Sequence, residues 1–437
     1  MLTLITIKNT NFVYIYRKLV KQKYRVNKKD YRIHIIGAGI SGLIAATVLE
    51  QKGYSPVIFE ATNRVGGRVK TDIISGYQLD HGFQVLLTAY PAAKKYLDYE
   101  ALELQNFLPG ASIFKNGKQE VIGDPMRDVS LLFSTLAANI GTVADKLKIL
   151  KLNINLKKKT IAEIFSDKEQ STFSYLKELD FSSDIINDFF KPFFSGIFLE
   201  DKLETSSRMF QFVYKMFGEG NAALPKAGIE EIPRQLLRKL KSTTFHYDTF
   251  VSSILDSKIV LADGQEIESD FTIIATEASN LVPNLKTKPI AWQSCDTLCF
   301  ETEKRTINKP LIGLIPFQDT IINNIFYYTS LKTKVSAGKE LLSVTVVNNQ
   351  GLSGKALIDR VQQELTKFCG ITTSTFIKHY SIPKSLPKLS ELHYDISPSD
   401  TRLTKNIYLA GDIQLNGSLN AAIIAGEKAA LGVIENL

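Results

Sequence analysis

The stretch from residue 31 to residue 61, YRIHIIGAGISGLIAATVLEQKGYSPVIFEA, constrains the fold of this 437-residue chain more than any other. Residues 33–36 are a short apolar run typical of a buried strand, and a glycine-rich turn follows at residues 37–42. Residues 41–52 have the pattern of a helix, and residues 56–60 that of a second buried strand. This order predicts a strand–helix–strand unit that opens a doubly wound parallel sheet.

The glycine-rich turn fits the pattern GxGxxG, with a strand before it and a helix after it. Gly37 permits the tight turn, Gly39 lets the backbone approach a pyrophosphate, and Gly42 lets the helix pack closely on the strand. The helix begins at Ser41, so its free N–H groups face the bound anion. Glu60 ends the second strand, where a carboxylate can accept both hydroxyls of an adenosine ribose. The unit therefore predicts a dinucleotide site.

A second glycine loop, RVGGRV at residues 64–69, follows the ribose-binding acid directly. Gly66 and Gly67 allow the backbone to lie against the pyrophosphate, and Arg68 can neutralise its charge. An ordinary NAD site has no evident use for this loop, so it favours FAD. The alternative is a surface turn with an incidental arginine.

These two loops together resemble the amino-terminal signature of the flavin-containing amine oxidase superfamily. That superfamily includes monoamine and polyamine oxidases, protoporphyrinogen oxidases and phytoene desaturases. The resemblance continues in order along almost the whole chain after residue 31. The further segments that carry it are LDHGFQVLLTAYP (79–91), FFKPFFSGIF (189–198), ALPKAGIEEIPRQL (223–236), TFVSSILDSKIVLADGQEIESDFTIIAT (249–276) and YLAGDIQLNGSLNAAI (408–423).

The resemblance implies a non-covalently bound FAD and transfer of a hydride to it from a small hydrophobic substrate. The substrate would lie in a mostly apolar cavity between two domains. Ala421 departs from the family pattern, which usually has glycine there. By position, the resemblance places Gly82 and Gln84 beside the flavin, the backbone of Val251 on adenine, Gly411 and Asp412 on the ribityl chain, and Ser418 and Leu419 near the pyrimidine end of the ring.

We expect an α/β chain, α+β overall, in which a Rossmann-like FAD-binding domain is assembled from separated segments. A mixed α/β substrate-binding domain is inserted between them. The predicted segments are a basic extension at 1–30, an FAD-binding domain at 31–90, 222–287 and 395–437, and a substrate-binding domain at 91–221 and 288–394.

Two local elements are predicted outside the nucleotide motifs. Asp263-Gly264 joins two alternating strands and signals a hairpin. Residues 131–154 are predicted to form an amphipathic helical stretch, and the lysine run at 157–159 a solvated face.

The net charge of +8 sits almost entirely at the amino terminus. Residues 1–30 carry eight Lys or Arg and one Asp, or +7, which leaves +1 for the remainder. The balanced remainder excludes nucleic-acid binding as a main function. The extension has helically spaced apolar residues among its basic ones, so it is either irregular or in peripheral contact with an anionic membrane.

The chain has three cysteines, too few for a disulfide framework, which favours a reducing, cytoplasmic location. Membrane association through residues 1–30 is the alternative. Cys295 and Cys299 lack companions at zinc-site spacing and are interpreted as small hydrophobes in a strand, so no metal site is predicted. The sequence makes no prediction about oligomeric state.

The choice of branch within the superfamily depends on two departures and one likeness. Amine-oxidising members carry a lysine near the flavin, and Thr297 stands at the nearest matching position. Members with covalent FAD carry a cysteine before the last motif, whereas residues 395–415 contain none. HYSIPKSLPKL, residues 379–389, resembles the desaturase and protoporphyrinogen-oxidase branches. We therefore expect dehydrogenation or isomerisation of a carotenoid-like or tetrapyrrole-like molecule, with amine oxidation as the alternative.

No catalytic residue is predicted. His81 lies beside the predicted flavin, where it is either an acid or base or a residue held by the turn. Arg127 is either an anion ligand or structural. His34 is interpreted as a satisfied core residue and Trp292, the only tryptophan, as core.

The sequence leaves two other classes of function open. Rab GDP-dissociation inhibitors resemble this fold and bind prenylated partners without flavin, so a non-catalytic lipid-binding or prenyl-binding escort is the first. An NAD-dependent dehydrogenase is the second, in which case Arg68 and the carboxy-terminal motif would be coincidental. Flavin content separates both from an FAD-dependent oxidoreductase.

Overall fold

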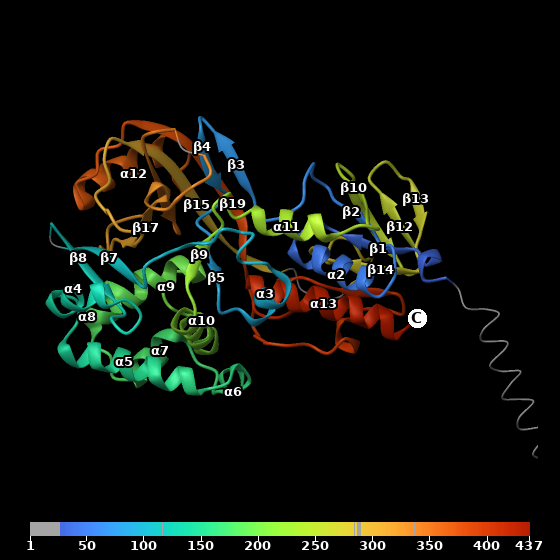
Figure 1. The fold of residues 1–437 in the computed structure, drawn as a ribbon, viewed down its shortest axis with the longest axis horizontal. Coiled ribbons are helices and arrows are strands. Elements are labelled where there is room, and N and C mark those ends of the chain that lie inside the picture. Colours follow the sequence, from blue (N-terminus) through green and yellow to red (C-terminus); the bar gives the residue numbers. More distant parts are fainter. Residues whose placement is uncertain (1–26, 116, 284, 286–289, 336) are drawn as a thin grey trace, which may run out of the picture.

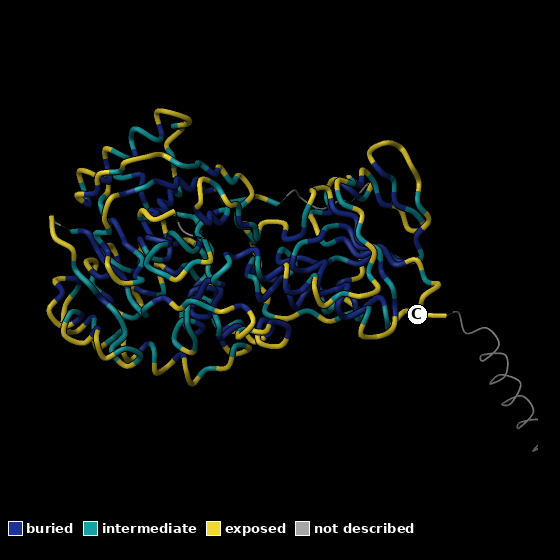
Figure 2. The backbone as a smooth tube through the Cα atoms, turned by 45° about the horizontal axis from the view of Figure 1, so that its top comes forward, coloured by how far each residue is buried: buried dark blue, intermediate teal, exposed yellow. Residues whose placement is uncertain are grey.

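The computed structural model describes residues 27–437 except 116, 284, 286–289 and 336. The basic extension, for which the sequence leaves an irregular segment or membrane contact open, lies outside the described residues as far as residue 26. Lys28–Asp30 form a short 3₁₀ turn. The chain folds into two halves, both with buried residues inside, and the largest hydrophobic cluster includes residues from both (Figures 1 and 2). Among the described helices, none has the length and apolarity that a membrane span needs.

The first half is built on a five-stranded parallel sheet with the order β10-β2-β1-β14-β20. Its strands come from three separated stretches of chain, as the sequence predicts for a Rossmann-like sheet. Helix α2 (Ile40–Gln51) connects β1 to β2 and packs against α13 (Leu419–Glu435). The strands are β1 (Ile33–Ile36), β2 (Val57–Phe59), β10 (Thr244–His246), β14 (Phe271–Ile274) and β20 (Ile407–Leu409).

A small antiparallel sheet covers the other face of the parallel sheet. Ile36, Phe59 and Ile274 pack there against Ile254 and Ile259. The covering sheet consists of β11 (Val251–Leu255), β12 (Lys258–Leu261) and β13 (Glu266–Glu268). The Asp263-Gly264 hairpin is confirmed, because β12 and β13 pair in antiparallel fashion and Gly264 has φ +89°.

The second half is built on a mixed seven-stranded sheet with the order β19-β15-β18-β17-β16-β7-β8. Its longest members, β15 and β19, pair along most of their length and run towards the first half. Helix α12 (Gly354–Cys369) packs on one face of this sheet. The strands are β7 (Gly110–Lys115), β8 (Lys118–Gly123), β15 (Ala291–Thr302), β16 (Ile312–Leu314), β17 (Ile322–Tyr327), β18 (Glu340–Val346) and β19 (Thr375–Lys388).

A group of helices lies beside this sheet, at the lower left of Figure 1. They are α4 (Leu132–Ala137), α5 (Val143–Lys158), α6 (Ile161–Ser166), α7 (Thr172–Glu178), α8 (Ser183–Ile185), α9 (Lys191–Phe198) and α10 (Ser207–Glu219). The short elements near the junction of the halves are β3 (Thr71–Ile74), β4 (Tyr77–Asp80), β5 (Leu86–Leu87), α3 (Pro91–Tyr96), β6 (Gln105–Asn106), β9 (Ala222–Leu224) and α11 (Glu231–Lys239).

The predicted helical stretch at 131–154 is divided into α4 and α5. The break follows from the residues between them, because Gly141 adopts a left-handed φ of +63° and Thr142 caps α5. The Thr142 hydroxyl accepts from the Asp145 backbone N–H, and the Asp145 carboxylate accepts from the Thr142 N–H, which is a capping box.

His34 lies in β1 and is buried, as expected, but its Nδ1 has no hydrogen-bond partner among the described residues. Burial, with a smaller contribution from Arg32, lowers the pKa of His34 from 6.5 to about 4. The unfolded chain therefore binds a proton at His34 below pH 6.5 that the folded chain does not bind until about pH 4.

We expect the free energy of unfolding to fall by up to about 3 kcal/mol from His34 alone as the pH drops from 6.5 to 4. The variant His34→Val lacks this titration and should lose less stability over the same interval. Urea unfolding of both proteins at several pH values measures the difference, with His393→Asn at an exposed histidine as the control. Equal acid sensitivity in His34→Val and the unmodified chain would contradict the prediction.

Candidate active site

A cavity of about 1980 Å³ is lined by residues from both halves of the molecule. It runs from the carboxyl ends of the parallel strands, at Gly37 and Glu60, to the helices beside the seven-stranded sheet. This is the crevice in which open α/β sheets bind their ligands. Thirteen of the fifteen residues predicted to bind FAD line it: Gly37, Gly39, Ser41, Glu60, Gly66, Gly67, Arg68, Gly82, Gln84, Gly411, Asp412, Ser418 and Leu419.

The three glycines of the first turn have different surroundings. Gly37 has φ +103°, a conformation that side chains rarely adopt. A Cβ added to Gly42 would lie 2.0 Å from the carbonyl oxygen of Gly37, so Gly42 allows α2 to begin against β1. Gly42 faces the Gly37 carbonyl and Ala275 rather than the cavity, so it is not part of the cavity lining. A Cβ added to Gly39 would meet nothing within 4 Å, because this residue faces the open cavity.

The Glu60 carboxylate is buried and held at both oxygens. Oε2 accepts from the Ala38 backbone N–H at 2.7 Å, and Oε1 accepts from the N–H and hydroxyl of Thr62 at 2.9 and 2.7 Å. These hydrogen bonds hold the carboxylate in one orientation, and its remaining lone pairs can accept from a ligand in the cavity. Val251 does not line the cavity; it is buried against Phe59 and pairs with Leu261.

Arg68 crosses from the second glycine loop to the carboxy-terminal segment. Its Nη2 lies 2.5 Å from Oδ1 of Asp412, and its Nη1 donates to the Ser385 carbonyl at 3.1 Å. The guanidinium also stacks over Trp292 at 5.3 Å from the ring centroid. The interpretation of Trp292 as core is therefore wrong, since it is half-buried and lines the cavity.

The last glycine turn orients Asp412. Gly411 has φ +119°, and the Asp412 backbone carbonyl accepts from the N–H of Leu415 and of Gly417. Ser418 then caps α13 by accepting from the Ala421 N–H at 3.0 Å. Ala421, the departure from the family pattern, is fully buried within this first turn.

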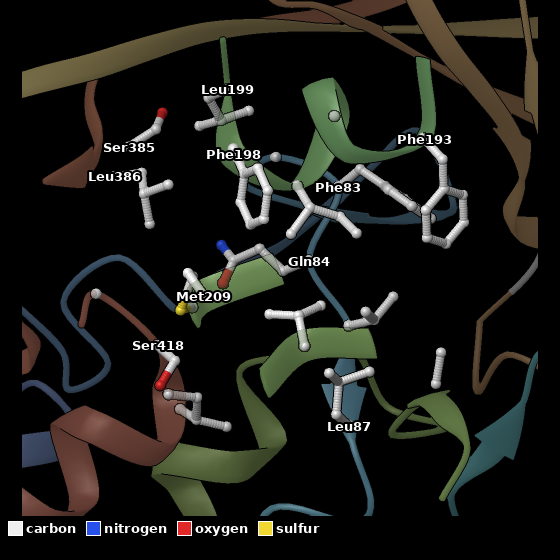
Figure 3. A pocket seen from close by; sticks show the side chains of 18 of the residues that line it. Phe83, Gln84, Leu87, Phe193, Phe198, Leu199, Met209, Ser385, Leu386 and Ser418 are labelled. Atoms are coloured by element: carbon white, nitrogen blue, oxygen red, sulfur yellow. The ribbon is translucent and has the colours of Figure 1, made fainter. Parts of the chain in front are cut away.

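The cavity wall around Gln84 is largely apolar (Figure 3). Gln84 projects among these side chains, and its amide nitrogen donates to the carbonyls of Arg68 and His81 at 2.9 and 2.8 Å. A polar group anchored in an apolar wall can orient a ligand. The apolar side chains labelled in the view are Phe83, Leu87, Phe193, Phe198, Leu199, Met209 and Leu386.

Asp72 organises a polar network that no sequence pattern predicts. Its Oδ2 lies 2.7 Å from His81 Nε2 and accepts from the Tyr380 hydroxyl at 2.9 Å, while Oδ1 accepts from Arg64 at 2.7 Å. Burial opposes ionisation, but these hydrogen bonds outweigh it and lower the pKa of Asp72 to about 2. Burial and Asp72 together raise the pKa of Tyr380. The cavity wall therefore holds an anionic Asp72 beside a protonated Tyr380.

His81 is thus held by a carboxylate and by the Tyr380 ring, 4.4 Å away between centroids, while it lines the cavity. Arg127 also lines the cavity, but its guanidinium donates to the carbonyls of Phe217 and Gly220 and to the Asn221 side chain. Arg127 therefore has a structural role, which is the second of the two interpretations.

Strand β15 brings Cys295 to the cavity and keeps Thr297 beneath its surface. Cys295 Sγ lies 3.2 Å from the Ser385 hydroxyl, and burial raises the pKa of this thiol. Thr297 is fully buried and pairs with Tyr380 and Thr345, which both line the cavity from the same side of the sheet. Its hydroxyl has no hydrogen-bond partner in the described part of the chain.

Comparison with known proteins agrees with this architecture. The protoporphyrinogen oxidase 2 of Arabidopsis thaliana is 27% identical over 169 residues, which cover 38% of this chain and only 32% of that protein. An oxidoreductase from Methanosarcina mazei superposes with a TM-score of 0.70 at 17% identity, covering 92% of this chain and 100% of that one. Cyclohexylamine oxidase from Brevibacterium oxydans IH-35A gives 0.66 at 15% identity, covering 93% and 99%.

The two solved structures are too distant in sequence to show more than a shared fold. The model of the flavin containing amine oxidoreductase family, in contrast, matches residues 40–434, nearly the whole chain. The match includes the whole mixed sheet, every strand of the parallel sheet except β1, and most of the residues that line the cavity. This chain therefore belongs to the flavin-containing amine oxidoreductases, a family of FAD-dependent oxidoreductases with a distant relationship to protoporphyrinogen oxidases.

Proposed function

We propose that this protein binds FAD non-covalently and uses it to dehydrogenate a hydrophobic small molecule. The observation that carries the proposal is the continuity of one cavity from the glycine turns to a wall of phenylalanines. Bound FAD supplies a ring that accepts a hydride. The chain contributes binding, orientation and an apolar enclosure that limits the access of water.

The polar end of the cavity fits the two ends of a dinucleotide. In the proposal, the N–H groups at Ser41 and the open face of Gly39 receive the pyrophosphate, together with Gly37, Gly66 and Gly67. Glu60 accepts from the adenosine ribose, and Arg68 compensates charge. Asp412, with Gly411, binds the ribityl chain, and Gly82, Gln84, Ser418 and Leu419 lie along the flavin. Val251 and Gly42 do not line the cavity, so we propose no contact between them and the dinucleotide.

We also propose the domain division on this basis. All five strands of the parallel sheet fall within 31–90, 222–287 and 395–437, which would form the FAD-binding domain. All seven strands of the mixed sheet fall within 91–221 and 288–394, which would form the substrate-binding domain.

Non-covalent attachment is supported by the surroundings of the cysteines. Residues 395–415 contain no cysteine. Cys295 is the cysteine that lines the cavity among the described residues, and its raised pKa keeps it a thiol at neutral pH. A thiol is a poor nucleophile compared with a thiolate, so Cys295 is a poor candidate for linkage.

Amine oxidation is the second candidate, and Lys378 is the observation that favours it. This lysine lies on β19, two residues from Tyr380, and lines the cavity. Thr297, at the position where amine-oxidising members carry their lysine, speaks against it. The phenylalanine wall places a hydrophobic substrate first.

The first test concerns the attachment and the site of FAD. We expect purified protein to be yellow and to release FAD into the supernatant on heat denaturation. Asp412→Ala should retain FAD about tenfold more weakly, because a charged hydrogen bond contributes about 1.5–3 kcal/mol. Asp395→Ala, at an exposed aspartate outside the cavity, is the matched control. Flavin that stays with the precipitate, or equal occupancy in both variants, would contradict the assignment.

Substitutions at Gly39 and Gly42 of the first turn separate an effect on FAD binding from an effect on folding. Gly42→Ala should lower the stability of the flavin-free protein by about 1–3 kcal/mol, since its methyl group would overlap the Gly37 carbonyl. Gly39→Ala should leave that stability unchanged and weaken FAD binding by at least about tenfold, or 1.4 kcal/mol. Thermal unfolding without flavin, followed by titration with FAD, measures both. Unchanged FAD binding in Gly39→Ala would show that the pyrophosphate lies elsewhere.

The substrate class is tested by anaerobic bleaching of the bound flavin. We expect phytoene-like or tetrapyrrole compounds to bleach the visible absorbance of the bound oxidised flavin, because they transfer a hydride to it. Primary amines and polyamines should leave the flavin absorbance unchanged. Bleaching by amines alone would select the second candidate and overturn the first.

A further inference from the structure

Nine large apolar side chains are exposed on a single stretch of chain that includes α4 and α5. They are Met126, Val129, Leu132, Phe133, Leu136, Val143, Leu147, Leu150 and Ile154, here called the α4–α5 face. The structure exposes fifteen such side chains among its described residues, so most of them gather in these 29 positions. Phe133 is 81% exposed and Val129 is 80% exposed. Apolar clusters of this kind mark interaction sites rather than ordinary surface.

Helix α5 is apolar on two opposite sides. Leu152 and Leu156 are buried against the protein, which is the face that a surface helix needs. Val143, Leu147 and Leu150 follow one another at helical spacing on the outward side, and Ile154 continues that row. The protein's own core therefore does not explain the outward row.

Lysines border the outward row of α5 on both sides. At about 100° per residue, Lys146 and Lys157 lie on one side of it and Lys151 and Lys158 on the other. The single acid of the helix, Asp145, is buried in its capping interactions. An apolar row bordered by lysines is the pattern of a helix that lies in the interface of an anionic bilayer. The lysine run that the sequence suggested to be a solvated face thus borders an apolar surface.

The α4–α5 face is also continuous with the cavity. Six of its nine side chains line the cavity as well: Met126, Leu132, Leu136, Val143, Leu147 and Leu150. They lie at the end of the cavity away from the glycine turns, on the side of the molecule opposite the parallel sheet (Figure 1). The exposed apolar surface is therefore the rim of the cavity.

We propose that the α4–α5 face docks on an anionic lipid bilayer and turns the mouth of the cavity towards the lipid. The apolar side chains enter the acyl boundary, and the exposed Lys151, Lys157 and Lys158 meet phosphate headgroups. Lys146 instead donates to the carbonyls of Leu136 and Ala138. Charge distinguishes this occupant from a second copy of the chain, because a two-fold contact through this face would bring the lysines of both copies together. Docking itself does not depend on the redox reaction proposed above, although the proposed hydrophobic substrate gives it a purpose.

Sedimentation of the full-length, flavin-loaded protein with phosphatidylcholine–phosphatidylglycerol vesicles tests the proposal without any substrate. Val129→Ser/Phe133→Ser removes two exposed side chains that do not line the cavity, so folding and flavin content should be kept. We expect partitioning to fall at least about tenfold in this variant. Lys151→Glu/Lys158→Glu should weaken it about fivefold or more per lysine at low salt and little on pure phosphatidylcholine.

Two further variants test whether vesicle binding depends on the α4–α5 face, on exposed phenylalanines elsewhere or on the amino-terminal extension. Phe173→Ser/Phe250→Ser changes exposed phenylalanines elsewhere and should leave partitioning unchanged. Arg17→Glu/Lys18→Glu/Lys21→Glu tests the basic amino-terminal extension. Loss of vesicle binding in that variant, with full binding by Val129→Ser/Phe133→Ser, would overturn the proposal. A dimer that Val129→Ser/Phe133→Ser converts to a monomer in light scattering, with vesicle binding absent in both, would overturn it too.

Discussion

The close approach of α2 to its two neighbours is the constraint on which the rest of the site depends. Gly42 lets α2 begin against the Gly37 carbonyl, and Gly426 of α13 lies so close to Ser41 that a Cβ would sit 2.3 Å from the Ser41 carbonyl. These contacts bring the first and last segments of the chain together at one end of the parallel sheet. The Arg68–Asp412 ion pair spans the same junction. A methyl group at Ala421 is tolerated because the tight contact occurs at Gly426, further along the helix.

The parts of the fold that depend on local geometry could be predicted from the sequence. Strand β1, helix α2 and the hairpin at Asp263-Gly264 each follow from glycine placement and apolar periodicity over fewer than twenty residues, roughly the reach of such patterns. The resemblance to the family also depends on short motifs, spaced along the chain. Each motif needs a particular backbone conformation, and only a few residue types allow it. That restriction is what makes such motifs readable in a single sequence.

The parts that depend on distant contacts could not be predicted. Asp72 and Tyr380 are 308 positions apart and meet only because β19 runs back towards β3. Trp292 is an aromatic residue at the start of an apolar strand, and nothing local distinguishes packing in a core from stacking on Arg68. Helix α5 presents apolar residues on two sides, so periodicity gives no answer about which side the core covers.

The two apolar sides of α5 have a physical explanation if one cavity holds both the cofactor and the substrate. A chain that must hold a charged dinucleotide and an apolar substrate in one space needs a polar wall and an apolar wall. Here the glycine turns form the polar wall, and the helices beside the seven-stranded sheet supply much of the apolar wall, together with Phe83 and Leu87. An apolar substrate has negligible solubility in water, so an apolar wall that ended in bulk water would leave the substrate an unfavourable step. With the function and the docking proposed above, extending that wall outward as the α4–α5 face would remove the step. The substrate would then pass from lipid to cavity while it remained against apolar side chains throughout.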